Sequence, residues 1–160
     1  MILLLECIIF CFLMGLICFL GTGNDDKNIK SFRNYSDELK GLLRNNDKYK
    51  DKIKEANPIV VFVSNLVLFL IIEFIFGLFI RTDNFLYNFV ALLILGQVAN
   101  IFDLVIMDLL WFRNTSRVRF SEYSDDKYYK YMKGHINSFL KALLMFTLVA
   151  LIDGSILMLF

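Results

Sequence analysis

Long apolar runs alternate with charged segments along this chain of 160 residues. Four runs reach the length of roughly 20 residues that a helix needs to cross a bilayer, and they cover residues 1–20, 59–80, 85–112 and 136–160. Two charged segments, residues 22–57 and 113–135, lie between them. The pattern predicts an all-α integral membrane protein, with residues 1–160 forming a single domain built as a bundle of four transmembrane helices.

Composition supports the membrane class. Hydrophobic residues make up 58% of the chain, 17 residues are Phe, and the mean hydropathy is +0.59. These values lie beyond the apolar fraction of ordinary soluble domains. The lipid bilayer is therefore the first partner that the sequence implies.

The basic residues predict the orientation. Of the 17 Lys and Arg residues, nine lie in residues 22–57 and six in residues 113–135. Basic residues of short loops stay on the cytoplasmic side, and Trp111, Phe112 and Arg113 have the order typical of an interface. We therefore expect a protein of the cell membrane with both loops cytoplasmic and both termini extracytoplasmic, as an even number of crossings requires.

The first apolar run lacks the features of a cleaved signal peptide. It has no basic residue near its start and carries Glu6 instead. We expect a retained helix, with cleavage near residues 21–23 as the alternative. Its three cysteines form no redox or metal-binding pair and are expected to pack as small residues, with acylation of Cys18 as the alternative. The sequence implies no cofactor.

The segment 22–57 contains apolar residues at spacings near the helical period. Asn34 is the predicted N-cap of a helix that extends to Glu55, and Asn45 and Asn46 mark a break in it. This predicts an amphipathic cytoplasmic helix that lies on the lipid headgroups or packs beneath the bundle, with protein binding as the alternative. Its apolar side is predicted to comprise Tyr35, Leu39, Leu42, Leu43, Tyr49 and Ile53.

The second and third crossings are predicted to form a helical hairpin. Asn57 and Pro58 are an N-cap and a proline at the first helical position, which together begin the second crossing. Only residues 81–84 separate its end from the third crossing. A connection this short requires antiparallel neighbours.

Three of the carboxylates inside the predicted crossings lie at a similar depth. Counting 1.5 Å per residue from the middle of each crossing places Glu6, Glu73 and Asp153 in the outer half, roughly 5 to 7 Å from the midplane. If they converge, like charges so close would hold protons or bind a metal or organic cation. If they do not, each carboxyl group is protonated and bonds to a neighbouring helix, or lies shallow enough to reach water. Which metal, if any, the site would take is unknown at this point.

The third crossing carries a second set of polar residues. Gln97, Asn100, Asp103 and Met107 recur on one helical face, which we expect to look into the bundle. Asp108 lies off that face, near the interface, where Lys141 or Arg113 could pair with it. The one histidine, His135, rules out a cluster of histidine ligands within the chain and is expected at the headgroup boundary.

The second half of the chain resembles a family of small multi-pass membrane proteins of Firmicutes-type bacteria, whose function is unassigned. The resemblance covers about a quarter of the chain and rests on an ordered set of residues, namely Asp103, Asp108, Trp111, Arg113, Arg119, Glu122, Tyr131, His135, Phe139 and Lys141. It implies a bacterial membrane protein and no particular chemistry.

Three classes of function fit these observations. The first is a non-enzymatic accessory or interaction subunit of a membrane assembly, as a homo-oligomer or with other membrane subunits. The second is a small oligomeric transporter or channel that uses its intramembrane carboxylates for protons or cations. The third is an enzyme similar in layout to the microsomal glutathione transferases, although their Arg- and Asn-bearing motif is missing from the second crossing. No nucleic-acid partner is expected, because Tyr and basic residues are common beside a crossing.

Overall fold

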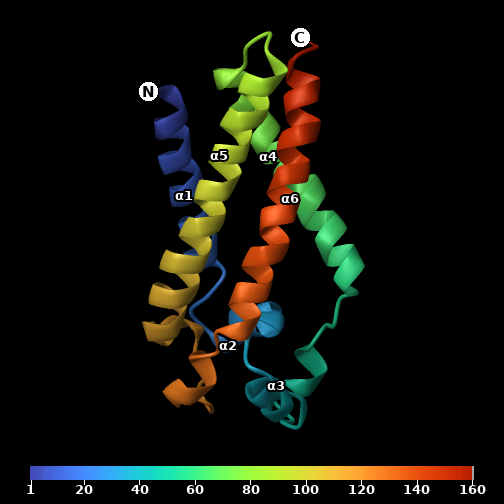
Figure 1. The fold of residues 1–160 in the computed structure, drawn as a ribbon. Coiled ribbons are helices and arrows are strands. Elements are labelled where there is room, and N and C mark those ends of the chain that lie inside the picture. Colours follow the sequence, from blue (N-terminus) through green and yellow to red (C-terminus); the bar gives the residue numbers. More distant parts are fainter. Residues whose placement is uncertain (160) are drawn as a thin grey trace. The chain divides into compact units, whose positions relative to one another are not determined.

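The computed structural model describes residues 1–159, and Figure 1 shows their elements in chain order. The protein is 79% helical, and the described residues contain no strand beyond an isolated bridge between Phe120 and Tyr123. Four helical segments are long and apolar enough to cross a membrane. The predicted all-α class is therefore confirmed, as is the number of helices long and apolar enough to cross a membrane.

The long helices begin within three residues of the predicted starts. They are α1 (Ile2–Leu20), α4 (Pro58–Ile80), α5 (Phe85–Phe102) with its direct continuation η3 (Asp103–Phe112), and α6 (Lys133–Leu157). The charged segments contain short helices: α2 (Asp25–Asn28), η1 (Ile29–Asn34), α3 (Asp37–Arg44), η2 (Lys50–Lys52), η4 (Ser116–Val118) and η5 (Asp126–Tyr129).

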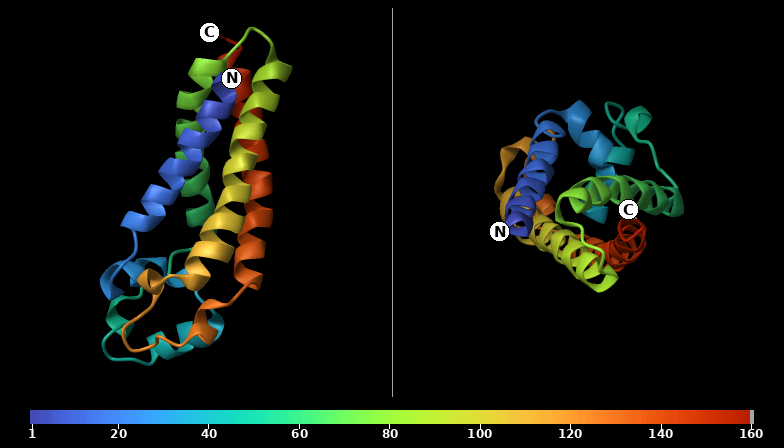
Figure 2. Two further views of the ribbon diagram at one scale, coloured as in Figure 1. Left: turned by 90° about the vertical axis from the view of Figure 1, so that its left-hand side faces the viewer. Right: turned by 90° about the horizontal axis from the view of Figure 1, so that it is seen from above.

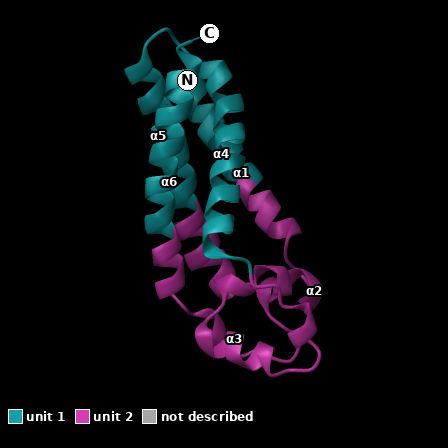
Figure 3. Cartoon of the chain, turned by 90° about the vertical axis from the view of Figure 1, so that its right-hand side faces the viewer, with its two compact units in different colours: residues 1–13, 56–102, 139–160 teal, residues 14–55, 103–138 magenta. Residues whose placement is uncertain are grey.

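The chain divides into two compact units, which Figure 3 shows in different colours. Unit 1 comprises Met1–Leu13, Ala56–Phe102 and Phe139–Phe160, and so holds most of the apolar helices. Unit 2 comprises Met14–Glu55 and Asp103–Ser138. It therefore contains nearly all of both charged segments.

In unit 1, helices α4 and α5 form the predicted hairpin. Asn57 accepts a hydrogen bond from the backbone N–H of Ile59 at 2.8 Å and so caps α4, with Pro58 at its start, as predicted. At the other end, the side chain of Asn88 accepts from the N–H of Thr82 and donates to its carbonyl, each at 2.8 Å. The connection 81–84 is thereby fixed to the first turn of α5.

Aromatic side chains hold α1 and α6 to this hairpin. The ring of Phe10 lies 5.4 Å from that of Phe76 and 6.3 Å from that of Phe69, whose other neighbour is Phe146 at 4.8 Å. The views in Figure 2 agree that the unit 1 parts of α5 and α6 lie side by side. Figures 1 and 2 also show the N-terminus, the connection 81–84 and the C-terminal end of α6 at one end of this unit.

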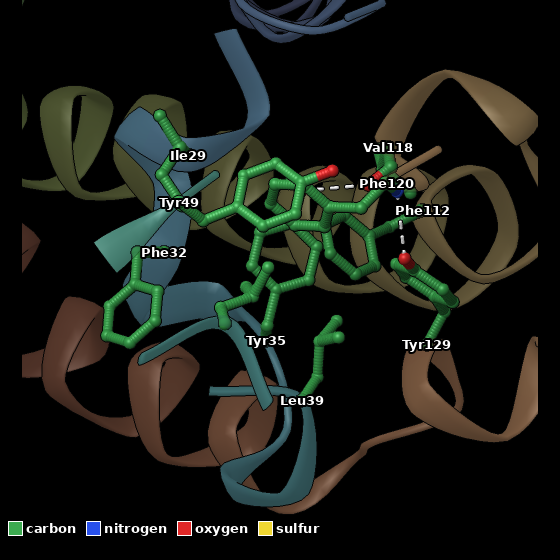
Figure 4. Packing of buried hydrophobic residues seen from close by; sticks show 10 residues of the cluster. Ile29, Phe32, Tyr35, Leu39, Tyr49, Phe112, Val118, Phe120 and Tyr129 are labelled. Atoms are coloured by element: carbon green, nitrogen blue, oxygen red, sulfur yellow. Dashed lines mark hydrogen bonds between the residues drawn. The ribbon is translucent and has the colours of Figure 1, made fainter. Parts of the chain in front are cut away.

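Unit 2 has a core of its own, rich in tyrosine and phenylalanine (Figure 4). The fully buried hydroxyl of Tyr35 donates to the carbonyl of Val118 at 2.9 Å. The hydroxyl of Tyr129 accepts from the N–H of Phe120 at 3.0 Å and donates to the carbonyl of Tyr123 at 2.6 Å. These bonds satisfy buried backbone groups, which would otherwise lose their partners on leaving water. The buried members are Ile29, Phe32, Tyr35, Leu39, Leu43, Tyr49, Phe112, Val118, Phe120 and Tyr129.

The predicted N-cap at Asn34 is wrong. Asn34 ends η1, Tyr35 is extended so that its ring enters the core, and Ser36 caps α3 by accepting from the N–H of Leu39 at 3.3 Å. Helix α3 ends at Asn45, where the break was predicted. The segment 34–55 therefore forms short helices separated by turns rather than one helix.

Candidate functional site

The three carboxylates predicted to matter are all buried in unit 1. Glu73 of α4 is fully buried, Asp153 of α6 is 2% exposed and Glu6 of α1 is 5% exposed. Among the described residues, neither oxygen of Glu6 or Glu73, nor Oδ2 of Asp153, has a hydrogen-bond partner. Buried polar groups without partners are rare in folded proteins, so each one calls for a functional or structural explanation.

Glu73 lies at the point where three helices meet. A Cβ atom on Gly96 of α5 would lie 2.5 Å from Oε1 of Glu73 and 2.7 Å from Cδ1 of Phe146 of α6. One turn further along α4, a Cβ atom on Gly77 would lie 2.5 Å from Cδ1 of Leu157. The glycines therefore provide the room in which the carboxylate and its neighbours pack.

The structure does not gather all three carboxylates into one cation site. Within residues 1–159, no group of three or more His, Cys, Asp or Glu side chains is arranged to hold a metal ion. Glu73 and Asp153 are close enough to interact electrostatically. The three carboxylates therefore form no metal site among the described residues.

The predicted polar face of the third crossing bonds to α6. Gln97 donates from Nε2 to the carbonyl of Leu143 at 3.1 Å, and Asn100 donates from Nδ2 to the carbonyl of Phe139 at 3.3 Å. Asn100 also donates to Oε1 of Gln97 at 3.3 Å. These amides act as the hydrogen-bonding contacts that are common between transmembrane helices.

Past Asn100, the third crossing changes its helical form. In η3 the hydrogen bonds run over five residues rather than four, which makes it a π-helix. In an α-helix of 3.6 residues per turn, Asp103 and Asp108 would point in different directions, whereas five residues make about one turn of a π-helix. Asp103 and Asp108 are within electrostatic range of one another, and the prediction that Asp108 lies off the polar face stays a prediction.

Asp108 pairs with His135, not with the predicted partners. Its Oδ2 lies 2.9 Å from Nδ1 of His135, which is itself buried. Arg113 contacts the sulfur of Met132 instead. Lys141 is exposed and belongs to unit 1. The sequence could not show this pair because it joins two separate helical elements.

A further polar cluster in unit 2 centres on Asp25. Its carboxylate accepts hydrogen bonds from Lys48, Tyr49 and Ser121 at 2.6 to 3.0 Å. Partial burial acts to raise the pKa of Asp25, but the bonds from Lys48, Ser121 and Tyr49 outweigh it and hold the pKa well below its ordinary value. The hydrogen bond to Asp25 likewise raises the pKa of Lys48. The sequence did not predict this cluster, because no local pattern indicates contacts between distant segments.

Comparison with known proteins adds no family. No protein-family model, curated protein or solved structure matches this chain.

Proposed function

We propose that this chain is a non-enzymatic multi-pass membrane protein that acts as an interaction subunit of a membrane assembly, and that its partner is a second copy of itself. The observation that carries the proposal is Asn65 of α4. Its side chain is exposed although it lies eight residues into an apolar span of 23 residues, and Ser64 beside it is exposed too. The only buried residues of α4 are Glu73, Gly77 and Ile80.

An exposed amide at this depth favours association. Lipid offers Asn65 no hydrogen-bond partner, whereas a facing helix does, at a gain of about 0.6 to 2 kcal/mol per bond. An Asn side chain carries both a donor and an acceptor, so two copies related by a two-fold axis satisfy each other. This self-complementarity supports a homo-oligomer over a partner of different sequence.

The oligomeric state in lipid nanodiscs or mild detergent tests this proposal. We expect the wild-type chain to form an oligomer, and Asn65→Leu to weaken it strongly because the interhelical hydrogen bonds are lost. Val67→Leu is the matched control, because Val67 is also exposed on α4. It lies two residues after Asn65, and so points to the opposite side of the helix. A monomeric wild type, or an oligomer that Asn65→Leu leaves unchanged, would contradict the proposal.

We also propose that the protein lies in the cell membrane with both termini outside and both charged segments in the cytoplasm. Support comes from the fifteen basic residues of those segments. In a background without cysteine, an impermeant reagent applied from outside should label Asp83→Cys and spare Asn45→Cys and Asp125→Cys. Labelling of position 45 from outside would reverse the orientation.

Transport of protons or cations is the second candidate, and Glu73 favours it. A fully buried carboxylate without a partner inside a membrane span is a candidate for ion binding. In proteoliposomes, Glu73→Gln should abolish a proton or cation flux while leaving the fold intact. A wild-type chain that carries no such flux would contradict the transport function, whereas the proposed function as an interaction subunit would be unaffected.

A further inference from the structure

The only histidine of the chain is buried, with one ring nitrogen beside a carboxylate and the other without a partner among the described residues. His135 is 5% exposed, and its Nδ1 lies 2.9 Å from Oδ2 of Asp108. The ring of Phe112 packs edge-on against it at 5.3 Å. Within residues 1–159, Nε2 is buried and has no hydrogen-bond partner. This is an imidazole oriented by a carboxylate, with its second nitrogen left available.

The charges around this ring come mainly from η3. Its π-helical form places Asp103 about one turn before Asp108, and Asp103 is close enough to both Asp108 and His135 to interact electrostatically. Cys18 of α1 lies in electrostatic range of the two aspartates. Two carboxyl groups therefore lie within electrostatic range of one imidazole, in a setting where unbalanced negative charge is costly.

We propose that His135 and Asp108, with Asp103 beside them, form a proton-binding site. Asp108 holds the proton on Nδ1, which fixes the tautomer and leaves the lone pair of Nε2 as the place where a further proton adds. The added proton forms a bond to Nε2 and breaks none in the protein. The positive charge of the imidazolium is then balanced by the carboxylate of Asp108.

Proton binding at this site changes the bonding within unit 2. Once protonated, Nε2–H is a buried donor that needs an acceptor. Asp103 is the other carboxyl group within electrostatic range of His135. Uptake of the proton therefore favours a closer approach between η3 and the start of α6, so the site links protonation to the geometry of these two elements. This inference is independent of the self-association proposed above.

The single histidine makes the test direct, because nitrogen-15 NMR of histidine-labelled protein in nanodiscs reports only His135. At high pH the neutral ring should carry its proton on Nδ1, and lowering the pH should protonate Nε2. Asp108→Asn should abolish the tautomer preference, because the carboxylate that orients the ring is lost. Asp108→Glu keeps the carboxylate and should retain the preference.

Glu122→Gln is the matched control for charge removal. Glu122 also lies in unit 2, but it is exposed and bonds to Asn46, so the tautomer of His135 should not change. Three results would overturn the proposal: a neutral ring with its proton on Nε2, an Nε2 that takes up no proton as the pH is lowered, or a tautomer preference that Glu122→Gln abolishes as Asp108→Asn does.

Discussion

Ser121 donates two hydrogen bonds to Asp25, one from its backbone N–H at 3.0 Å and one from its hydroxyl at 2.6 Å. The two residues lie 96 positions apart in the chain. Tyr49 and Lys48 donate to the same carboxylate at 2.7 and 2.8 Å. One carboxylate thus connects the two charged segments, which makes unit 2 a folded unit rather than two separate loops.

Replacement of Asp25 by Asn should destabilise unit 2 by about 1 to 3 kcal/mol, the scale for charged hydrogen bonds and groups left without partners. The fluorescence of Trp111, the only tryptophan, reports unfolding of this unit. Asp26→Asn is the control, because Asp26 is 75% exposed and pairs only with Lys52. Equal effects of the two substitutions would contradict the central role of Asp25.

The lowered pKa of Asp25 also predicts acid sensitivity. A carboxyl group whose pKa is lower in the folded than in the unfolded protein stabilises the fold above the ordinary value of 3.8, and this stabilisation is lost as the pH falls below that value. The wild-type protein should therefore lose stability below about pH 4 more steeply than Asp25→Asn does. Denaturant titrations at a series of acidic pH values measure the difference.

The raised pKa of Tyr129 predicts that the fold loses stability at high pH. Burial raises its pKa to about 12 from the ordinary 10.0. A tyrosine with a raised pKa stabilises the fold below the ordinary value, and the contribution is lost as the pH rises from about 10 to about 12. The phenolate absorbance of Tyr129→Phe should lack one late titration step. If Tyr129→Phe loses absorbance near pH 10 instead, burial does not protect this hydroxyl.

The amide contacts between α5 and α6 can be tested in the same way. Asn100→Leu removes the bonds to Phe139 and Gln97, and should cost about 0.6 to 2 kcal/mol, the range for hydrogen bonds between membrane helices. Val98→Leu is the control, because Val98 is exposed on the same helix. Steric-trap or denaturant unfolding in lipid measures both. An unchanged stability in Asn100→Leu would mean that these bonds exchange freely with other partners.

The crossings were predictable because hydrophobic length is a property of the sequence itself. A run such as residues 59–80 has no stable alternative to a helix in lipid, and Asn57 with Pro58 marks its start through local backbone chemistry. The burial of Glu73 was suggested by the same reasoning, since a carboxylate at that depth must avoid lipid. Hydrophobic length and local backbone chemistry were therefore enough to predict the long apolar helices and the start of α4.

The pairing of Asp108 with His135 was not predictable from those rules. It joins η3 to the start of α6, and the sequence of η3 shows no signal that distinguishes the five-residue hydrogen bonding of this π-helix from four-residue hydrogen bonding. The cap of α3 moved from Asn34 to Ser36 because Tyr35 has to reach the core formed with Val118. In both cases a contact between distant segments decided the local geometry.

Gly96 lies where α5 packs against Glu73 of α4. A Cβ atom on Gly96 would lie 2.5 Å from Oε1 of Glu73 and 2.7 Å from Phe146, so Gly96→Ala should destabilise the protein by about 1 to 3 kcal/mol through overpacking. Removing the carboxylate relieves one of the two contacts. Glu73→Ala combined with Gly96→Ala should therefore cost less than the sum of the single changes, by about 0.5 to 3 kcal/mol.

Gly41→Ala is the matched control for this cycle. Gly41 also lies within a helix, but nothing lies within 4 Å of the added Cβ atom, so alanine should stabilise α3 by about 0.5 to 1 kcal/mol because it restricts the unfolded chain. If Gly→Ala destabilises the protein at position 96 but stabilises it at position 41, the loss at position 96 comes from crowding and not from helix propensity. Additive effects of Glu73→Ala and Gly96→Ala would show that the carboxylate does not press on α5, and the space around Glu73 would then have to be explained by Phe146 alone.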